Sequence, residues 1–144
     1  MRLSVRSIMG LLSSAIALAF VLTWAPQVAN SQDGAPKENK GLKSTLKQAV
    51  DLGPEIDGMA GRQLRMRVLN LEPGGHIRIH DHKDRPAVVY ILQGTITVTF
   101  GDGSVKILRG GDTSSANKDT VHWARNDGEE PVVFLAVDVF HNKK

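Results

Sequence analysis

From about residue 44 onward, apolar residues alternate with polar ones, and Gly, Asn, Asp or Pro interrupts the alternation at short intervals. Alternation with a period of two, broken by turn residues, is typical of an all-β sandwich or barrel. No long helical period competes with it. The pattern predicts one all-β domain over residues 44–141, with strands at about 46–52, 63–71, 76–82, 87–93, 95–100, 104–108, 112–116, 120–125 and 131–139.

The first 29 residues have a different pattern. Arg2 and Arg6 precede a mainly apolar run from Ile8 to Ala25, and small and polar residues follow. This order is typical of a secretory signal peptide, with cleavage after Ala29 as the best of several options. We therefore expect a periplasmic or secreted protein with no stable membrane span after cleavage. An uncleaved membrane anchor is the alternative, although the run is short of the roughly 20 apolar residues that span a bilayer comfortably.

Residues 30–43 join this leader to the domain. Most of them are polar, with Gly and Pro among them, and they lack apolar periodicity. Such a composition predicts a disordered tether.

Charge and composition narrow the classes of function. Without residues 1–29 the chain has 16 basic and 15 acidic residues, a net charge of +1 against +3 for the whole chain. We find no basic stripe and no helix-turn-helix pattern, so a nucleic acid is not an expected partner. The chain has no cysteine, so a metal site would have to use histidine and oxygen ligands.

The segment from His76 to His82 has a pattern that can bind metal. Side chains on a strand alternate between faces, so its even-numbered residues, three histidines and Arg78, share one face, and Ile77 and Ile79 occupy the other. Residues two apart on one face lie about 6.6 to 7 Å apart at Cα, which lets His80 and His82 reach one ion. His76 is on the order of 13 Å from His80 along the strand, too far to join that ion.

From Pro73 to Asn126 the chain resembles the two motifs of the cupin superfamily. Gly74, His80, His82 and Gly94 fall at the places of the first motif. The glutamate of that motif is replaced here by Ala87, so the usual carboxylate ligand is missing.

The second cupin motif is matched by Gly111, His122 and Asn126. The resemblance implies a small cupin barrel, a double-stranded β-helix or jelly roll, in which His80, His82 and His122 bind one divalent metal ion. Asn126 could orient a ligand or close the turn before Asp127 and Gly128.

Three neutral imidazoles leave the charge of a divalent ion uncompensated. A small anionic, preferably bidentate, ligand would neutralise it, and Arg78 is the expected clamp for such a substrate. Among cupins, three-histidine sites resemble those of thiol and β-diketone dioxygenases, which use ferrous iron. The identity of the metal stays open between Fe, Zn, Mn, Ni and Cu, and affinity alone would favour copper or zinc.

Two classes of function therefore compete. One is a metal-dependent dioxygenase acting on a small anionic substrate, and the other is a non-catalytic module that captures a small molecule or a metal. Sugar-type isomerisation ranks last, because no histidine and carboxylate are paired for proton abstraction. The resemblance to cupins also implies a homodimer.

Three other residues on predicted strands need no role in the site. The positions of Arg65 and Arg67 are explained by exposure of their charges to solvent, and Tyr90 is expected to face away from Ala87.

Overall fold

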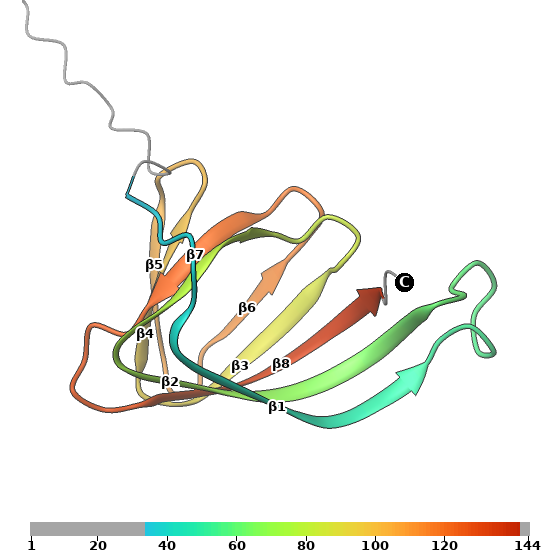
Figure 1. The fold of residues 1–144 in the computed structure, drawn as a ribbon, viewed down its shortest axis with the longest axis horizontal. Coiled ribbons are helices and arrows are strands. Elements are labelled where there is room, and N and C mark those ends of the chain that lie inside the picture. Colours follow the sequence, from blue (N-terminus) through green and yellow to red (C-terminus); the bar gives the residue numbers. More distant parts are fainter. Residues whose placement is uncertain (1–33, 142–144) are drawn as a thin grey trace, which may run out of the picture.

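The computed structural model describes residues 34–141, which form eight strands and no helix (Figure 1). The strands are β1 (Lys40–Asp51), β2 (Arg62–Asp81), β3 (Ala87–Gln93), β4 (Thr95–Phe100), β5 (Val105–Arg109), β6 (Thr113–Ala116), β7 (Val121–Arg125) and β8 (Val132–His141). They curve into a nearly closed barrel, which confirms the all-β prediction. The expected signal peptide lies outside the described residues. Within the described range, no helix that could cross a membrane is found.

The sheet brings together strands that are far apart in the sequence. Its order is β5-β4-β7-β2-β8-β3-β6, with β1 added on β2, and every pairing is antiparallel. The strands from Ala87 onward begin and end within two residues of their expected positions. The topology places β2 and β7, which carry the motif histidines, next to each other.

β2 is one strand of 20 residues where two strands and a turn were expected. Residues 62–71 pair with β8, and the residues from His76 on pair with β7. The segment 72–75 between them is a bulge, because Leu71 and His76 pair with the nearby residues Leu42 and Lys40 of β1. Gly74 adopts a φ of 66° there, which favours glycine. The predicted turn residues thus bend the strand without ending it.

The expected tether is ordered over much of its length. β1 begins at Lys40, and two groups before it bond to β2: the carbonyl of Pro36 accepts from the backbone N of Ile79, and Asn39 Oδ1 accepts from that of Arg78, both at 2.9 Å. These two amides lie where the β2–β7 pairing is interrupted. The prediction of a disordered segment to residue 43 is therefore wrong for residues 36–43, which supply the hydrogen bonds that β7 does not.

The inward faces of the strands form an apolar core. On β8 the buried residues alternate from Val132 to Asp138, as a half-buried strand requires. On β3, Val89 and Ile91 face inward, and Tyr90 is 45 % exposed, as expected from its position. The buried cluster comprises Leu69, Leu71, Ile91, Ile96, Val98, Leu108, Ala124, Val132, Phe134 and Ala136. Most of these side chains also line an internal cavity, so the barrel is hollow on the side of the histidines.

Candidate metal centre

The topology brings the three expected ligands together. His80 is near the end of β2 and pairs directly with His122 on β7, and His82 follows β2 at the start of the loop to β3. Each offers a ring nitrogen, and the three nitrogens lie within 4.8 Å of one another. They form the one such group of three found in the described part of the chain.

A bulge in β2 sets the direction of His80. Ile77 pairs with Ala124, and His80 pairs with His122. The chain thus advances three residues along β2 where it advances two residues along β7. The extra residue reverses the alternation, and Ile77 packs against the core on the same side as His80. The expected assignment of Ile77 to the opposite face is therefore wrong, because a regular strand was assumed where a bulge occurs.

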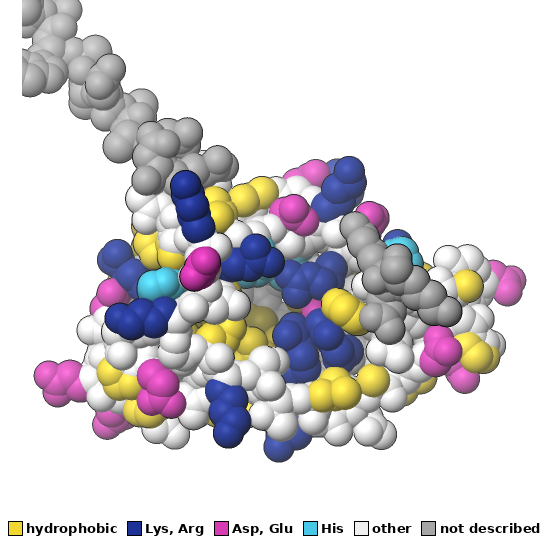
Figure 2. Space-filling view, in the orientation of Figure 1, with side chains coloured by type: hydrophobic (Ala, Val, Ile, Leu, Met, Phe, Trp, Pro, Cys, Tyr) yellow, Lys and Arg dark blue, Asp and Glu magenta, His cyan; other side chains and the backbone are white. Residues whose placement is uncertain are grey.

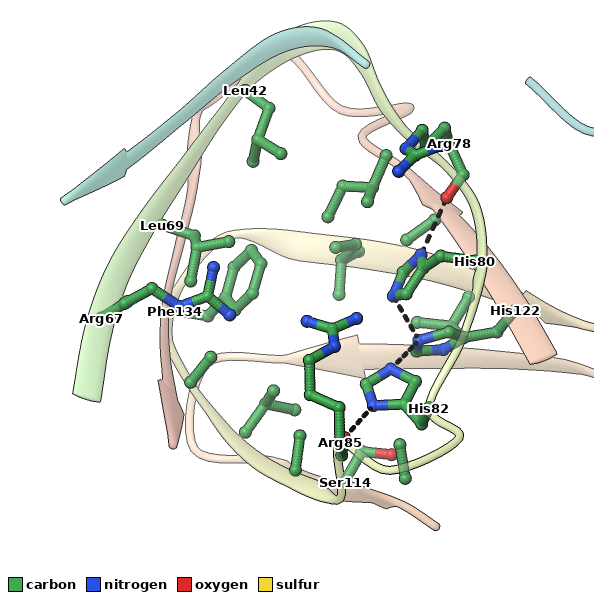
Figure 3. A pocket seen from close by; sticks show the side chains of 18 of the residues that line it. Leu42, Arg67, Leu69, Arg78, His80, His82, Arg85, Ser114, His122 and Phe134 are labelled. Atoms are coloured by element: carbon green, nitrogen blue, oxygen red, sulfur yellow. Dashed lines mark hydrogen bonds between the residues drawn. The ribbon is translucent and has the colours of Figure 1, made fainter. Parts of the chain in front are cut away.

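Hydrogen bonds fix the tautomers of two histidines. His80 Nδ1 is 2.9 Å from the carbonyl of Arg78, and His82 Nδ1 is 3.0 Å from the carbonyl of Arg85 (Figure 3). A carbonyl can only accept, so both Nδ1 atoms carry the proton and both Nε2 atoms present a lone pair when the rings are neutral. Backbone partners of this kind orient the histidine ligands of many metal sites.

The three Nε2 atoms converge on one point. His122 Nε2 is 3.0 Å from His82 Nε2 and 3.1 Å from His80 Nε2. Neutral His122 can donate to at most one of these two neighbours. In at least one of the two contacts, the lone pairs of two Nε2 atoms therefore face each other. A cation at this point would relieve that repulsion. Two nitrogen ligands at right angles on an ion about 2.1 Å away would lie about 3.0 Å apart, which matches both separations.

The site disfavours protonated histidine. Burial, followed by the charges of His80 and His82, lowers the pKa of His122 to about 3. The pKa values of His80 and His82 are also lowered, again mainly by burial. Neutral imidazole is the form that binds metal. His122 Nδ1 is buried with no hydrogen-bond partner among the described residues, and its ring stacks on Phe100 at 5.9 Å.

A cavity of about 600 Å³ opens beside the histidines (Figure 3). Its volume is within the range of small-molecule sites. One part of its wall is apolar and includes Leu69, Ile91 and Phe134. Ala87 lines it as well, so the position of the motif glutamate faces the cavity but supplies no carboxylate. Figure 2 shows the hollow in the middle of one face, bordered by several Lys and Arg side chains.

A buried carboxylate with three arginines forms a second polar group of the barrel. Asp138 on β8 has no exposed side-chain surface, and its oxygens are 2.9 Å from Arg65, 3.0 Å from Arg67 and 3.4 Å from Arg85. The side chains of Arg65 and Arg67 are only 16 % and 18 % exposed. The interpretation of these two residues as exposed charge is therefore wrong, because both are paired with a buried acid.

Arg67 and Arg85 also line the cavity, and the sequence analysis missed both as site residues. The sequence contained a signal for Arg67. It lies two and four residues before Leu69 and Leu71, so all three share one face of the strand, and both leucines are buried. A charged side chain on the core face of a strand needs an ionic partner. Arg85 gave no such signal, because it lies in the loop between β2 and β3.

Arg78, the expected clamp, lies at the cavity and is exposed. Its carbonyl holds the ring of His80, and its role toward a ligand stays a prediction. Asn126 does not line the cavity: its Nδ2 donates to the carbonyls of Leu71 and Glu130, and its Oδ1 accepts from the backbone N of Gly128. These bonds favour the turn role for Asn126.

Comparisons with known proteins agree with this geometry. A germin-like protein of subfamily 2 from Arabidopsis thaliana is 29 % identical over 85 residues, which cover 56 % of this chain and 39 % of that protein. The chain thus matches well under half the length of this relative.

Two solved structures share the fold at low identity. An uncharacterised Klebsiella pneumoniae protein with a double-stranded β-helix domain gives a TM-score of 0.58 at 21 % identity, covering 83 % of this chain and 95 % of that one. KdgF from Halomonas sp. gives a TM-score of 0.56 at 17 % identity, covering 71 % of this chain and 82 % of that one. The sequence model of the cupin domain matches residues 67–138, half of the chain. The chain belongs to the cupin family.

Proposed function

We propose that this chain is an exported cupin that binds one divalent metal ion on His80, His82 and His122 and acts as a metal-dependent dioxygenase on a small anionic molecule. The observation that carries the proposal is the convergence of three Nε2 atoms, separated by 3.0 and 3.1 Å, at the wall of the cavity. Two of these rings are oriented by backbone carbonyls. The centre is thus built for a cation and opens on space for a substrate.

The charge of the site supports an anionic ligand. Three neutral imidazoles leave both positive charges of the ion in place, and Ala87 adds no compensating carboxylate. Arg67, Arg78 and Arg85 line the same cavity. An anion that contacts the ion would be attracted by the ion and by the arginines. The apolar wall of the cavity would strengthen this attraction by excluding water.

The three-histidine ligand set supports oxygen chemistry. A bound ferrous ion would supply the electrons that activate O₂. Both oxygen atoms would enter the substrate, so the reaction needs no external reductant. The protein's own residues would hold the substrate beside the centre: the arginines bind its negative charge, and Leu69, Ile91 and Phe134 contact its apolar part.

A non-catalytic binding module is the second candidate, and the state of the carboxylates in and beside the cavity favours it. Asp138 is held by three arginines and is not free to accept a proton. Asp81 is exposed, and its Oδ1 accepts from the backbone N of Lys83. Asp81 is the one carboxylate among the described residues that line the cavity, because Asp138 is not part of that lining. General acid–base catalysis therefore has little support, whereas ligand binding needs no acid or base.

Export forms part of the proposal and rests on the sequence of residues 1–29, whose charged start and apolar run are typical of a signal peptide. Detection of the protein in the periplasm or medium, with a new amino terminus near residue 30, is the expected result. Retention of the first 29 residues in the membrane fraction would support the uncleaved anchor.

Elemental analysis of the purified protein tests the centre directly. We expect about one divalent ion per chain, lost in His80→Ala and kept in His76→Ala. His76 is a matched control because it lies on the same strand but does not line the cavity. Equal metal in both variants would contradict the site.

Oxygen uptake then separates the two candidate functions. Protein loaded anaerobically with ferrous iron is mixed with a β-diketone or with mercaptoacetate. Uptake that requires iron and is lost in His80→Ala supports the dioxygenase. Tight ligand binding without uptake favours the binding module.

A further inference from the structure

We propose that Arg67 and Arg85 form a carboxylate anchor inside the cavity, so that the ligand carries a chelating oxygen group for the metal and a separate carboxylate for the arginines. Since this names the ligand class of the same cavity, it rests on the proposed function. The nearest chemical description is a small, partly apolar keto acid whose carboxylate is not its metal-binding group.

The first support is an excess of positive charge. Arg65, Arg67 and Arg85 all contact a single carboxylate, that of Asp138. Two positive charges of this cluster are therefore uncompensated, although Asp138 is fully buried and the arginines are largely shielded from water. Uncompensated charge in such surroundings is costly and favours a bound anion.

The second support is the use of the guanidinium donors. Arg65 is held by strong contacts: its Nε and Nη2 donate to the two oxygens of Asp138 at 3.0 and 2.9 Å, and its guanidinium stacks on Phe140 at 3.7 Å. Arg85 has only long contacts, at 3.4 Å to Asp138 and 3.5 Å to the carbonyl of Asp81. Arg65 therefore has a structural role, whereas Arg85 retains strong donors for a ligand.

Arg67 lies between these two cases. Its Nη2 donates to Asp138 at 3.0 Å, but its Nη1 makes only a 3.5 Å contact to Ser44. Its Nε is buried and has no hydrogen-bond partner among the described residues. Because each guanidinium has five N–H donors in a planar fork that fits a carboxylate, Arg67 and Arg85 can together hold one.

The position of Arg85 links the anchor to the metal centre. Its charge acts on His80, His82 and His122 as well as on Arg67. Figure 3 shows the guanidinium of Arg85 within the cavity, between the labelled histidines and Arg67. Its carbonyl orients His82, so one residue positions a ligand of the metal with its backbone and faces the cavity with its side chain. A ligand on both sites would pass Leu69 and Phe134.

A carboxylate is favoured over a phosphate by the cluster itself. Asp138 already occupies one side of the guanidinium groups with carboxylate geometry, including the two-point contact from Arg65. A second carboxylate, with one negative charge, would lower the excess charge of the cluster from +2 to +1, and an enolate would lower the charge of a divalent metal centre by the same amount. Inorganic phosphate serves as a competing probe in the test.

Two β-diketones of equal length provide the experiment. Succinylacetone has a terminal carboxylate, and butyrylacetone has a methyl group in its place, so both chelate metal but only one can use the anchor. Their affinities are measured by calorimetry on the full protein loaded with zinc, which prevents turnover. We expect succinylacetone to bind about tenfold more tightly or better, a preference of at least about 1.4 kcal/mol.

Variants locate the source of that preference. Arg85→Met and Arg67→Met should each remove most of the preference, because each should weaken the binding of succinylacetone by a larger factor than that of butyrylacetone. Arg109→Met is the control, because Arg109 is exposed on β5 and does not line the cavity. Two independent variants keep the test usable if one of them fails to fold. A preference that persists in both variants would overturn the anchor.

The outcomes separate the two proposals. Equal binding of both diketones by the zinc-loaded parent overturns the anchor and leaves the metal centre standing. A parent that retains no metal overturns the proposed function, and the anchor is then tested on that protein with pentanoate against its uncharged amide, pentanamide. Tighter binding of pentanoate that Arg85→Met abolishes supports the anchor, and equal binding of the two compounds overturns it. Phosphate that displaces succinylacetone more strongly than glutarate does would also overturn the carboxylate assignment.

Discussion

Ala87 on β3 and Asp138 on β8 are direct partners in the antiparallel ladder. A buried carboxylate therefore lies one strand away from the position at which the cupin motif has its glutamate. Asp138 is bound by three arginines and is not part of the group of side chains that could hold a metal ion. In this barrel the inward carboxylate gathers positive charge near the three histidines and does not join them as a candidate ligand.

Ala87→Glu should restore the charge balance of the usual cupin site. Ala87 lines the cavity, so the new carboxylate would lie near both the histidines and Arg85. We expect divalent metal to bind about tenfold or more tightly and anionic ligands to bind more weakly, because the added charge attracts the ion and repels the ligand. Metal titration and calorimetry measure both effects. Val88→Glu is the control, because Val88 is 55 % exposed on the outer face. Unchanged metal and ligand affinities would show that residue 87 does not face the ion.

His122→Ala should abolish metal retention and preserve the fold. His122 contributes the nitrogen that lies close to both of the others, so its loss leaves only two ligands. Its side chain is partly exposed to the cavity, so the strands should tolerate its removal. Elemental analysis should find no bound metal, while the circular dichroism spectrum stays that of a β protein. Metal content equal to that of the parent would refute the assignment.

Asp138→Asn should strongly destabilise the barrel near neutral pH. Three arginines would lose the one counter-charge that they share among the described residues, and breaking a buried ion pair on one side costs about 3 to 5 kcal/mol. Urea unfolding, followed by tryptophan fluorescence, measures the loss. Asp119→Asn is the control, because its pair with Lys118 is highly exposed and is expected to contribute less than about 1 kcal/mol.

The same carboxylate gives a pH dependence of stability. Burial alone would raise the pKa of Asp138, but hydrogen bonds from Arg65 and the charges of Arg67, Arg65 and Arg85 outweigh it and lower the pKa below 3.8. The stabilisation is fully present above pH 3.8 and is lost as the pH falls through the lower pKa of the folded state. The free energy of unfolding should therefore decrease below pH 3.8 in the parent and change less in Asp138→Asn. Identical slopes in both proteins would exclude this role.

Asn126→Ala should destabilise the fold without affecting metal binding. The buried amide joins Leu71, Glu130 and Gly128 through three hydrogen bonds. Its removal leaves the buried carbonyl of Leu71 without this donor, and an unsatisfied buried group costs about 1 to 3 kcal/mol. Urea unfolding should show the loss, and metal content should stay at the parent level. Loss of metal from a folded variant would instead favour the role of orienting a ligand.

Gly94→Ala should destabilise the protein more than Gly111→Ala does. Both glycines have positive φ, 81° and 96°, so both variants share the backbone strain. A Cβ on Gly94 would lie 2.8 Å from the carbonyl of Pro131, whereas one on Gly111 meets nothing within 4 Å. The difference between the melting temperatures of the two variants isolates the destabilisation caused by the steric clash at Gly94. Equal melting temperatures would show that the turn at Gly94 relaxes freely.

The class of fold and the three expected metal ligands could be predicted from local patterns in the chain. Alternation and turn residues are local properties, so they predicted the strands from Ala87 onward to within two residues. The spacing of His80, His82 and His122 relative to the motif glycines indicates a cupin from the sequence alone, because each motif lies within one stretch of chain.

The direction of these side chains and the identity of their neighbours depend on contacts between distant segments. The bulge between Ile77 and His80 reverses the strand's alternation, and it arises from pairing with β7, a strand more than 40 residues later in the chain. The cluster of Arg65, Arg67 and Arg85 with Asp138 depends on the meeting of β2, β8 and a loop. A charged side chain shows in the sequence, but its ionic partner is set by contacts between distant segments, and these form only when the barrel closes.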